Sequence, residues 1–153
     1  MTVTKKSRVQ EVSLKYKRNR QKVSVGIFNA NEAYDVLKDN WDENRLDLLE
    51  EFKIVLLDRA NSVLGVSHIA TGGVSCCVVD PKIIFATALK ANSSSIILAH
   101  NHPSGNLTPS DSDVKITEKL IKAAQTLDMT IFDHLILTSD GYFSMAENGL
   151  IPR

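Results

Sequence analysis

The sequence predicts a single α/β (α+β) domain in which a mixed β-sheet is flanked by helices. The chain has 153 residues, of which 43% are hydrophobic and 24% charged, enough to bury a core of ordinary size. Its apolar segments alternate between the two-residue period of strands and the period of helices, in the order β, α, β, β, β, α, β, α, β, β. This order predicts a mixed sheet with helices packed against it.

The first helix is expected to begin near Asn29 or Asn31 and to end at about Asn40. Asn29 is followed three residues later by Glu32, a spacing typical of a capping box, although Ser or Thr is the usual cap there. A short helical segment within residues 41–49 is expected to lead into the next strand.

The middle of the chain is expected to form three strands and a helix. Alternating apolar residues predict strands over residues 52–57 and 63–69, paired as a hairpin. Residues 74–79 are interpreted as a further strand. Asp80 followed by Pro81 then predicts a helix start, with Asp as the N-cap and Pro at the first helical position.

The last third of the chain contains a buried strand, a polar loop, a helix and a closing hairpin. The run at residues 95–99 is apolar throughout, which is typical of a strand buried on both faces. A loop containing Pro and Gly follows at residues 100–109, and residues 108–111 are expected to open a long helix. Residues 131–137 and 142–146 are expected to pair as a hairpin.

Charge is balanced overall but unevenly distributed. Lys+Arg and Asp+Glu both number 18, which argues against a dedicated nucleic-acid coat protein or membrane-surface binder. Residues 1–22 carry eight basic residues and one acid, and apolar residues alternate over 12–16. We therefore expect residues 1–29 to form a basic N-terminal strand or extension ahead of a main domain over 30–153. Its lysines are either an arm for a polyanion or, as we favour, the solvated face of an edge strand.

Nothing in the sequence predicts export or membrane insertion. The longest apolar runs, such as 54–57 and 96–99, are strand-sized, and residues 1–8 contain no apolar region typical of a signal peptide. The two cysteines, Cys76 and Cys77, are adjacent and cannot close a useful disulfide loop. We expect a soluble cytoplasmic protein with no membrane partner.

Two histidines and an aspartate around the polar loop form the strongest chemical signal. His100 and His102 are one residue apart at the end of a buried strand, so their side chains point the same way. Asp113 lies near the start of the following helix, which can return toward that strand end. Two imidazoles and a carboxylate are typical of a catalytic zinc site, because three protein ligands leave one position for water. In the alternative interpretation, the histidines of a polar loop only form hydrogen bonds.

Other polar side chains near this loop receive separate predictions. Ser110 is expected near the second helical position, where its hydroxyl would cap only weakly and stay available to the site. His134 either orients a metal ligand or is a hydrogen-bonded sheet residue. Asn101 and Ser104 are expected to shape the loop through local hydrogen bonds from side chain to backbone.

The spacing of these residues resembles a known motif. His100-x-His102, seven residues, Ser110, two residues and Asp113 are similar to the JAMM motif of JAB/MPN+ metalloproteases. The resemblance covers roughly residues 30–150. The segments that resemble the bacterial RadC-like branch are HNHPSGNLTPSDSD, Glu50-Glu51-Phe52, Thr71-Gly72-Gly73, Asp80-Pro81-Lys82 and Phe132 to Ile136.

The resemblance implies a JAB/MPN (cytidine deaminase-like) fold with one Zn²⁺ per chain, bound by His100, His102 and Asp113. It further implies hydrolysis of a peptide or isopeptide bond through a zinc-activated water, with a protein or peptide as substrate. Longer RadC-like proteins carry an N-terminal helix-hairpin-helix segment that contacts DNA, and 153 residues leave no room for one. The chain is therefore expected to be a short form of the family.

The resemblance also implies a catalytic glutamate near the start of an upstream strand. The family pattern, a Glu two residues before the Phe of this strand, falls on Glu50, which we favour over Glu51. Glu50 would act as the proton shuttle, and the Ser110 hydroxyl would help to stabilise the oxyanion.

Two other functions remain open at this point. One is a DNA-repair-associated DNA-binding or nuclease factor, which would use the basic segment at residues 1–22 to contact phosphates. The other is a catalytically idle zinc-bearing interaction module. The sequence does not determine the oligomeric state.

Overall fold

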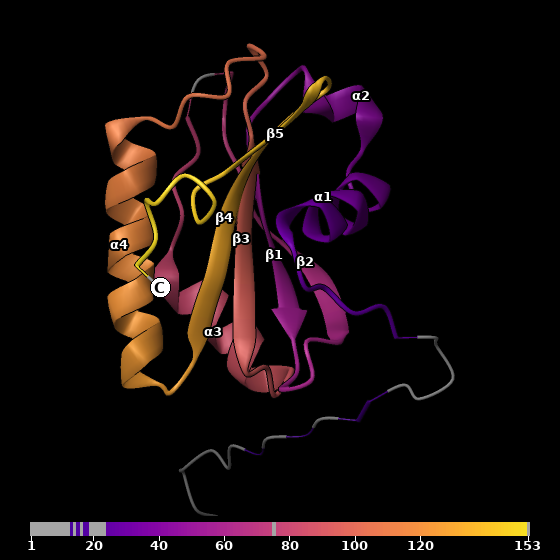
Figure 1. The fold of residues 1–153 in the computed structure, drawn as a ribbon, viewed down its shortest axis with the longest axis vertical. Helices are drawn as coiled ribbons and strands as arrows, with labels where there is room; N and C mark the ends of the chain where they lie inside the picture. The colour runs from indigo at the N-terminus through magenta and orange to yellow at the C-terminus, as the bar shows by residue number, and fades with distance from the viewer. Residues whose placement is uncertain (1–12, 14, 16, 19–23, 75, 153) are drawn as a thin grey trace, which may run out of the picture.

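Among the residues that the structure describes, five strands form one mixed sheet with helices on both faces, as the sequence predicts (Figure 1). The computed structural model describes residues 13, 15, 17–18, 24–74 and 76–152. The strands are β1 (Glu51–Leu57), β2 (Val63–Thr71), β3 (Ser95–Asn101), β4 (Thr130–Thr138) and β5 (Gly141–Ser144). The helices are α1 (Ala30–Asp39), α2 (Glu43–Leu46), α3 (Pro81–Lys90) and α4 (Asp111–Thr126).

The strand order is β2-β1-β3-β4-β5, so β3 lies at the centre of the sheet. β1 pairs antiparallel with both β2 and β3, β4 pairs parallel with β3, and β5 pairs antiparallel with β4. Every residue of β3 is buried. Since α4 connects the parallel strands β3 and β4, its N-terminus lies beyond the end of β3 that carries His100 (Figure 1).

The two faces of the sheet bury separate apolar clusters. One cluster joins alternate residues such as Ile54 and Leu98 to Leu120 of α4 and to α3. The other joins Val55 and its neighbours to Leu37 of α1. Because successive strand residues point to opposite faces, the continuous apolar runs of β1 and β3 supply both clusters.

The helix starts follow the predicted caps. Asn29 caps α1 through its side chain, which accepts a hydrogen bond from the Glu32 backbone N–H at 2.9 Å. Asp80 caps α3 in the same way, with Pro81 at the first helical position. These caps satisfy backbone N–H groups that have no partner within the helix.

The strand predicted over residues 74–79 is wrong for the residues that the structure describes there. The Gly73 N–H donates to the Cys76 carbonyl at 3.0 Å, and the described residues 74 and 76–79 have no strand assignment, although Cys77 and Val79 pack against the apolar cluster. Val74 and Val78 are 75% and 88% exposed, so neither is buried as the predicted strand would require.

The predicted N-terminal strand cannot be compared in the same way, because residues 12, 14 and 16 lie outside the described part of the chain. Nearer the main domain, Gly26 forms an isolated antiparallel bridge with Ser62.

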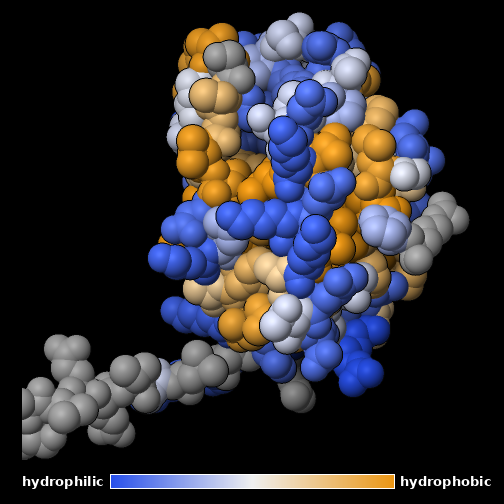
Figure 2. All heavy atoms as spheres, turned by 90° about the vertical axis from the view of Figure 1, so that its left-hand side faces the viewer, coloured by the Kyte–Doolittle hydropathy of each residue, from blue (hydrophilic) through white to orange (hydrophobic). Residues whose placement is uncertain are grey.

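The outer face of α4 is polar. Its exposed residues include Lys115, Glu118, Lys119 and Lys122, and hydrophilic side chains run along the middle of this side between hydrophobic ones (Figure 2). Within the described residues, no helix combines the length and apolar character needed to cross a membrane.

Candidate metal centre

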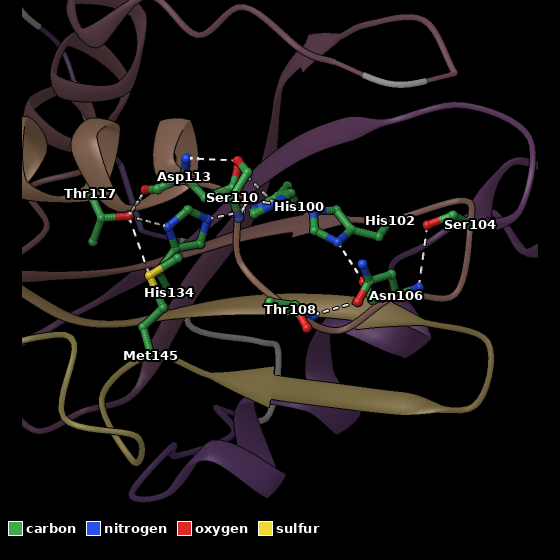
Figure 3. Close-up of polar contacts among 10 residues, drawn as sticks. All are labelled: His100, His102, Ser104, Asn106, Thr108, Ser110, Asp113, Thr117, His134 and Met145. Carbon is green, nitrogen blue, oxygen red and sulfur yellow. Dashed lines mark hydrogen bonds and ion pairs between the residues drawn. The ribbon is translucent and has the colours of Figure 1, made fainter.

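The structure brings His100, His102 and Asp113 together at the end of β3 (Figure 3). Their candidate ligand atoms all lie within 4.8 Å of one another. His100 Nε2 is 3.0 Å from His102 Nε2 and 3.3 Å from Asp113 Oδ1, and His102 Nε2 is 3.5 Å from Asp113 Oδ2. His100 is buried, while His102 and Asp113 retain limited access to solvent.

The loop after β3 fixes the orientation of the His102 ring. His102 Nδ1 lies 2.5 Å from the backbone carbonyl oxygen of Asn106. A carbonyl only accepts hydrogen bonds, so Nδ1 carries the proton in the neutral ring and Nε2 holds a lone pair toward the cluster. Gly105 has φ +81°, a conformation that favours glycine and lets the loop return to this position.

The donor set fits a metal ion. A tetrahedral zinc ion with bonds of about 2.0–2.2 Å has ligand atoms about 3.3–3.6 Å apart, close to the separations among these three residues. Two imidazole nitrogens that face each other at 3.0 Å need a proton or a cation between them. Two nitrogens and one carboxylate oxygen are ligands that zinc accepts in catalytic sites.

The local charges reinforce this arrangement. Burial alone would raise the pKa of the Asp113 carboxyl, but hydrogen bonds from His100 and His102 outweigh it and hold that pKa far below its ordinary value. The hydrogen bond to Asp113 is in turn the main reason why the pKa of His102 is raised. Asp113 is therefore a carboxylate, the form that a metal ion requires.

Ser110 does not occupy the second helical position predicted for it. It is the N-cap of α4, and its Oγ accepts a hydrogen bond from the Asp113 N–H at 3.1 Å. The Asp113 carboxylate reciprocates by accepting from the Ser110 N–H at 2.7 Å, which completes a capping box. Ser110 Oγ makes no other hydrogen bond among the described residues. Its own hydrogen is therefore free to be donated.

Glu50 lies directly before β1 and near the three candidate ligands. Its backbone pairs with that of Gly72 and Gly73, so it extends the ladder between β1 and β2 by one position. Burial raises the pKa of its carboxyl, while the charges of His100 and His102 act in the opposite direction. Glu50 is thus a buried carboxyl within electrostatic reach of the cluster.

Glu51 points to the opposite face of the sheet. Its Oε1 lies 3.3 Å from Arg45 Nη2 of α2 and 3.9 Å from His68 Nδ1 of β2. The alternation of the strand separates the two glutamates although they are adjacent in the chain.

The segment that carries Glu50 is attached to the centre of the sheet by Asn101. The Asn101 Oδ1 accepts from the Glu51 N–H at 2.7 Å, and its Nδ2 donates to the carbonyls of Leu46 and Leu49. These partners are about fifty residues away, so the prediction of local hydrogen bonds is wrong for Asn101. It is confirmed for Ser104, whose Oγ accepts from the Asn106 N–H at 3.3 Å.

A second buried histidine lies behind the candidate ligands. His134 Nε2 is 2.7 Å from His100 Nδ1, and His134 Nδ1 is 2.5 Å from Thr117 Oγ1 (Figure 3). His134 is therefore a hydrogen-bonded residue of β4, as one interpretation has it, and one of its partners is a candidate ligand, as the other requires. Thr117 was not singled out in the sequence, where its only signal is a position one helical turn after Asp113.

Comparison with known proteins agrees with this geometry. A family model described as "RadC-like JAB domain" matches residues 27–150. The chain is 38% identical to a "UPF0758 protein" of Aquifex aeolicus over 92% of its own length and 58% of that protein. It is 41% identical to a protein of the same name from Alkaliphilus oremlandii, over 67% of this chain and 44% of that protein. The chain therefore spans about half the length of the curated relatives that it matches.

Proposed function

The chain belongs to the RadC-like JAB domain family, and on that premise we propose that it is a zinc-dependent hydrolase of peptide or isopeptide bonds. The observation that carries the proposal is the convergence of His100, His102 and Asp113 on one point at the end of β3. A bound zinc ion supplies Lewis acidity, which makes a water molecule reactive near neutral pH.

The proposed role of Glu50 is proton transfer. Its carboxylate accepts a proton from the attacking water and delivers it to the nitrogen of the leaving amine. Two features support this role: its place beside the cluster, and burial that raises its pKa toward the range in which a carboxyl both accepts and releases protons.

The proposed role of Ser110 is to donate a hydrogen bond to the oxygen of the reacting carbonyl. Because Oγ already accepts from the Asp113 N–H, the hydroxyl is held in place and its hydrogen can point away from the helix. Ser110→Thr keeps both capabilities, whereas Ser110→Ala loses both. We expect only the alanine variant to lose turnover.

The decisive experiment compares metal-free and zinc-loaded protein on fluorogenic peptide and isopeptide-linked substrates. We expect one zinc per chain, hydrolysis that a chelator abolishes and zinc restores, and no hydrolysis by Asp113→Ala. Asp111→Ala is the matched control, because Asp111 lies in the same first turn of α4 but outside the ligand group. Hydrolysis that survives Asp113→Ala would contradict the proposal.

A different result would favour another function. One zinc per chain without turnover of any amide substrate would support an interaction module in place of an enzyme. The chain covers about half of its relatives, and the peptide or isopeptide substrate class is taken from the resemblance of its motif to that of JAB/MPN+ metalloproteases.

A further inference from the structure

We propose that Thr117 and His134 are positioning residues that hold His100 in the tautomer able to bind a metal ion. The inference rests on the proposed metal site and extends it to two residues that do not belong to the ligand group. Both are fully enclosed: Thr117 is 1% exposed and His134 is not exposed at all. Neither contacts solvent, so their polar atoms depend on one another.

The backbone carbonyl of Asp113 decides which partner donates in each of these hydrogen bonds. Thr117 Oγ1 lies 2.6 Å from the Asp113 carbonyl oxygen, which can only accept, so the threonine hydroxyl donates to it. The Met145 sulfur lies 3.5 Å from the same hydroxyl, a longer contact with a weaker acceptor. The hydroxyl hydrogen is thereby committed to Asp113.

The remaining hydrogens follow by elimination. With its hydrogen committed, Thr117 Oγ1 can only accept from His134, so His134 Nδ1 carries a proton. In a neutral ring His134 Nε2 is then the acceptor, and it takes the proton of His100 Nδ1 at 2.7 Å. In the neutral His100 ring, Nε2 then holds the lone pair that a metal ion binds, and this is the atom that faces His102 and Asp113.

The chain of contacts begins and ends on Asp113. The backbone carbonyl of Asp113 sets the direction of the hydrogen bonds, while its carboxylate lies 3.3 Å from His100 Nε2. Because Thr117 is one helical turn after Asp113, the helix itself keeps these two ends in register. Partners of this kind beyond the ligands fix the ring and strengthen its basicity.

Removal of the Thr117 hydroxyl should release this constraint. In Thr117→Val, His134 has no acceptor for its Nδ1 proton and can shift that proton to Nε2. It would then donate to His100 Nδ1 and force the His100 proton onto Nε2, the atom needed for the metal. We expect the zinc dissociation constant to rise about 10–100-fold, as for other residues that orient metal ligands.

The experiment measures zinc affinity by chelator competition, so it needs no substrate. Thr117→Ser keeps the hydroxyl and should bind zinc like the wild type. Thr87→Val is the matched control, because Thr87 of α3 makes the same bond to the carbonyl four residues earlier, at 2.7 Å, without contacting a histidine. Wild-type affinity in Thr117→Val would overturn the proposal, even if that variant were less stable.

A second measurement requires neither a variant nor a metal. Nitrogen-15 NMR of the histidine rings in the metal-free wild type identifies which ring nitrogen of His134 is protonated. A proton on Nδ1 alone supports the proposal, and a proton on Nε2 overturns it. If the wild type binds no zinc, the proposed function fails, while this spectrum still decides the inference about Thr117 and His134.

Discussion

The two faces of the sheet at the start of β1 place adjacent glutamates in very different surroundings. Glu50 and Glu51 are both buried, with 9% and 3% of their surfaces exposed. Glu50 lies within electrostatic reach of two histidines and an aspartate, whereas Glu51 pairs with Arg45 on the other side. Burial therefore does not separate a candidate catalytic carboxyl from a structural one; the groups around it do.

The same division runs through the His-x-His motif. His100 and His102 point toward the cluster, and Asn101 between them points to the opposite face, where it binds the backbone of the segment before β1. One face supplies the chemistry, and the other holds the Glu50 segment against β3.

The largest expected effect separates the two glutamates. Glu50→Gln should lower kcat about 10²–10⁴-fold, because the amide cannot accept a proton, while zinc affinity stays nearly unchanged. Glu51→Gln should keep turnover close to that of the wild type. The measurement is steady-state hydrolysis with zinc-loaded protein, and equal losses in both variants would contradict the division between the faces.

The next effect concerns stability and not turnover. Asn101→Ala removes three hydrogen bonds and leaves the buried Glu51 N–H and Leu46 carbonyl, and the partly buried Leu49 carbonyl, without this partner. We expect the free energy of unfolding, measured in urea, to fall by about 2–5 kcal/mol. Asn44→Ala, at an exposed position of α2, should change it by less than about 0.5 kcal/mol.

Zinc should stabilise the folded protein through the histidines on one face of the sheet only. At a free zinc concentration 100 times the dissociation constant, we expect the free energy of unfolding to rise by about 2.7 kcal/mol. His102→Ala should abolish this gain, and His68→Ala, which removes a histidine from the opposite face, should preserve it. Thermal melts with and without zinc measure this gain. If zinc stabilised His102→Ala and His68→Ala equally, the ion would bind elsewhere.

The smallest expected effect tests the ion pair of Glu51. Arg45→Met should lower the free energy of unfolding by about 1–2 kcal/mol, less than for a fully buried pair, because Arg45 is 41% exposed. In the Glu51→Gln background the same substitution should cost less, since no carboxylate then remains unpaired. A double-mutant cycle without coupling would show that the contact contributes nothing.

The sequence predicts a large part of this fold because its signals are local. The caps of α1 and α3 depend on a side chain and a backbone group within three residues, and both helices begin where their caps indicate. Strand patterns succeed for β1 and β3, where both faces are buried. The same pattern fails at the described residues 74 and 76–79, because an apolar run alone does not show that a neighbouring strand is available to pair with it.

The residues of the candidate site also differ in whether local sequence signals predict them. The sequence alone indicated His100, His102 and Asp113, because strand alternation and the start of the next helix already bring these residues toward one end of β3. Only the tertiary structure decided that Asn101 binds the segment before β1 and that Thr117 and His134 adjoin His100. The contacts of Asn101 and His134 join residues 17–55 apart in the chain, so they depend on strand register and helix packing, which no local pattern of residues encodes.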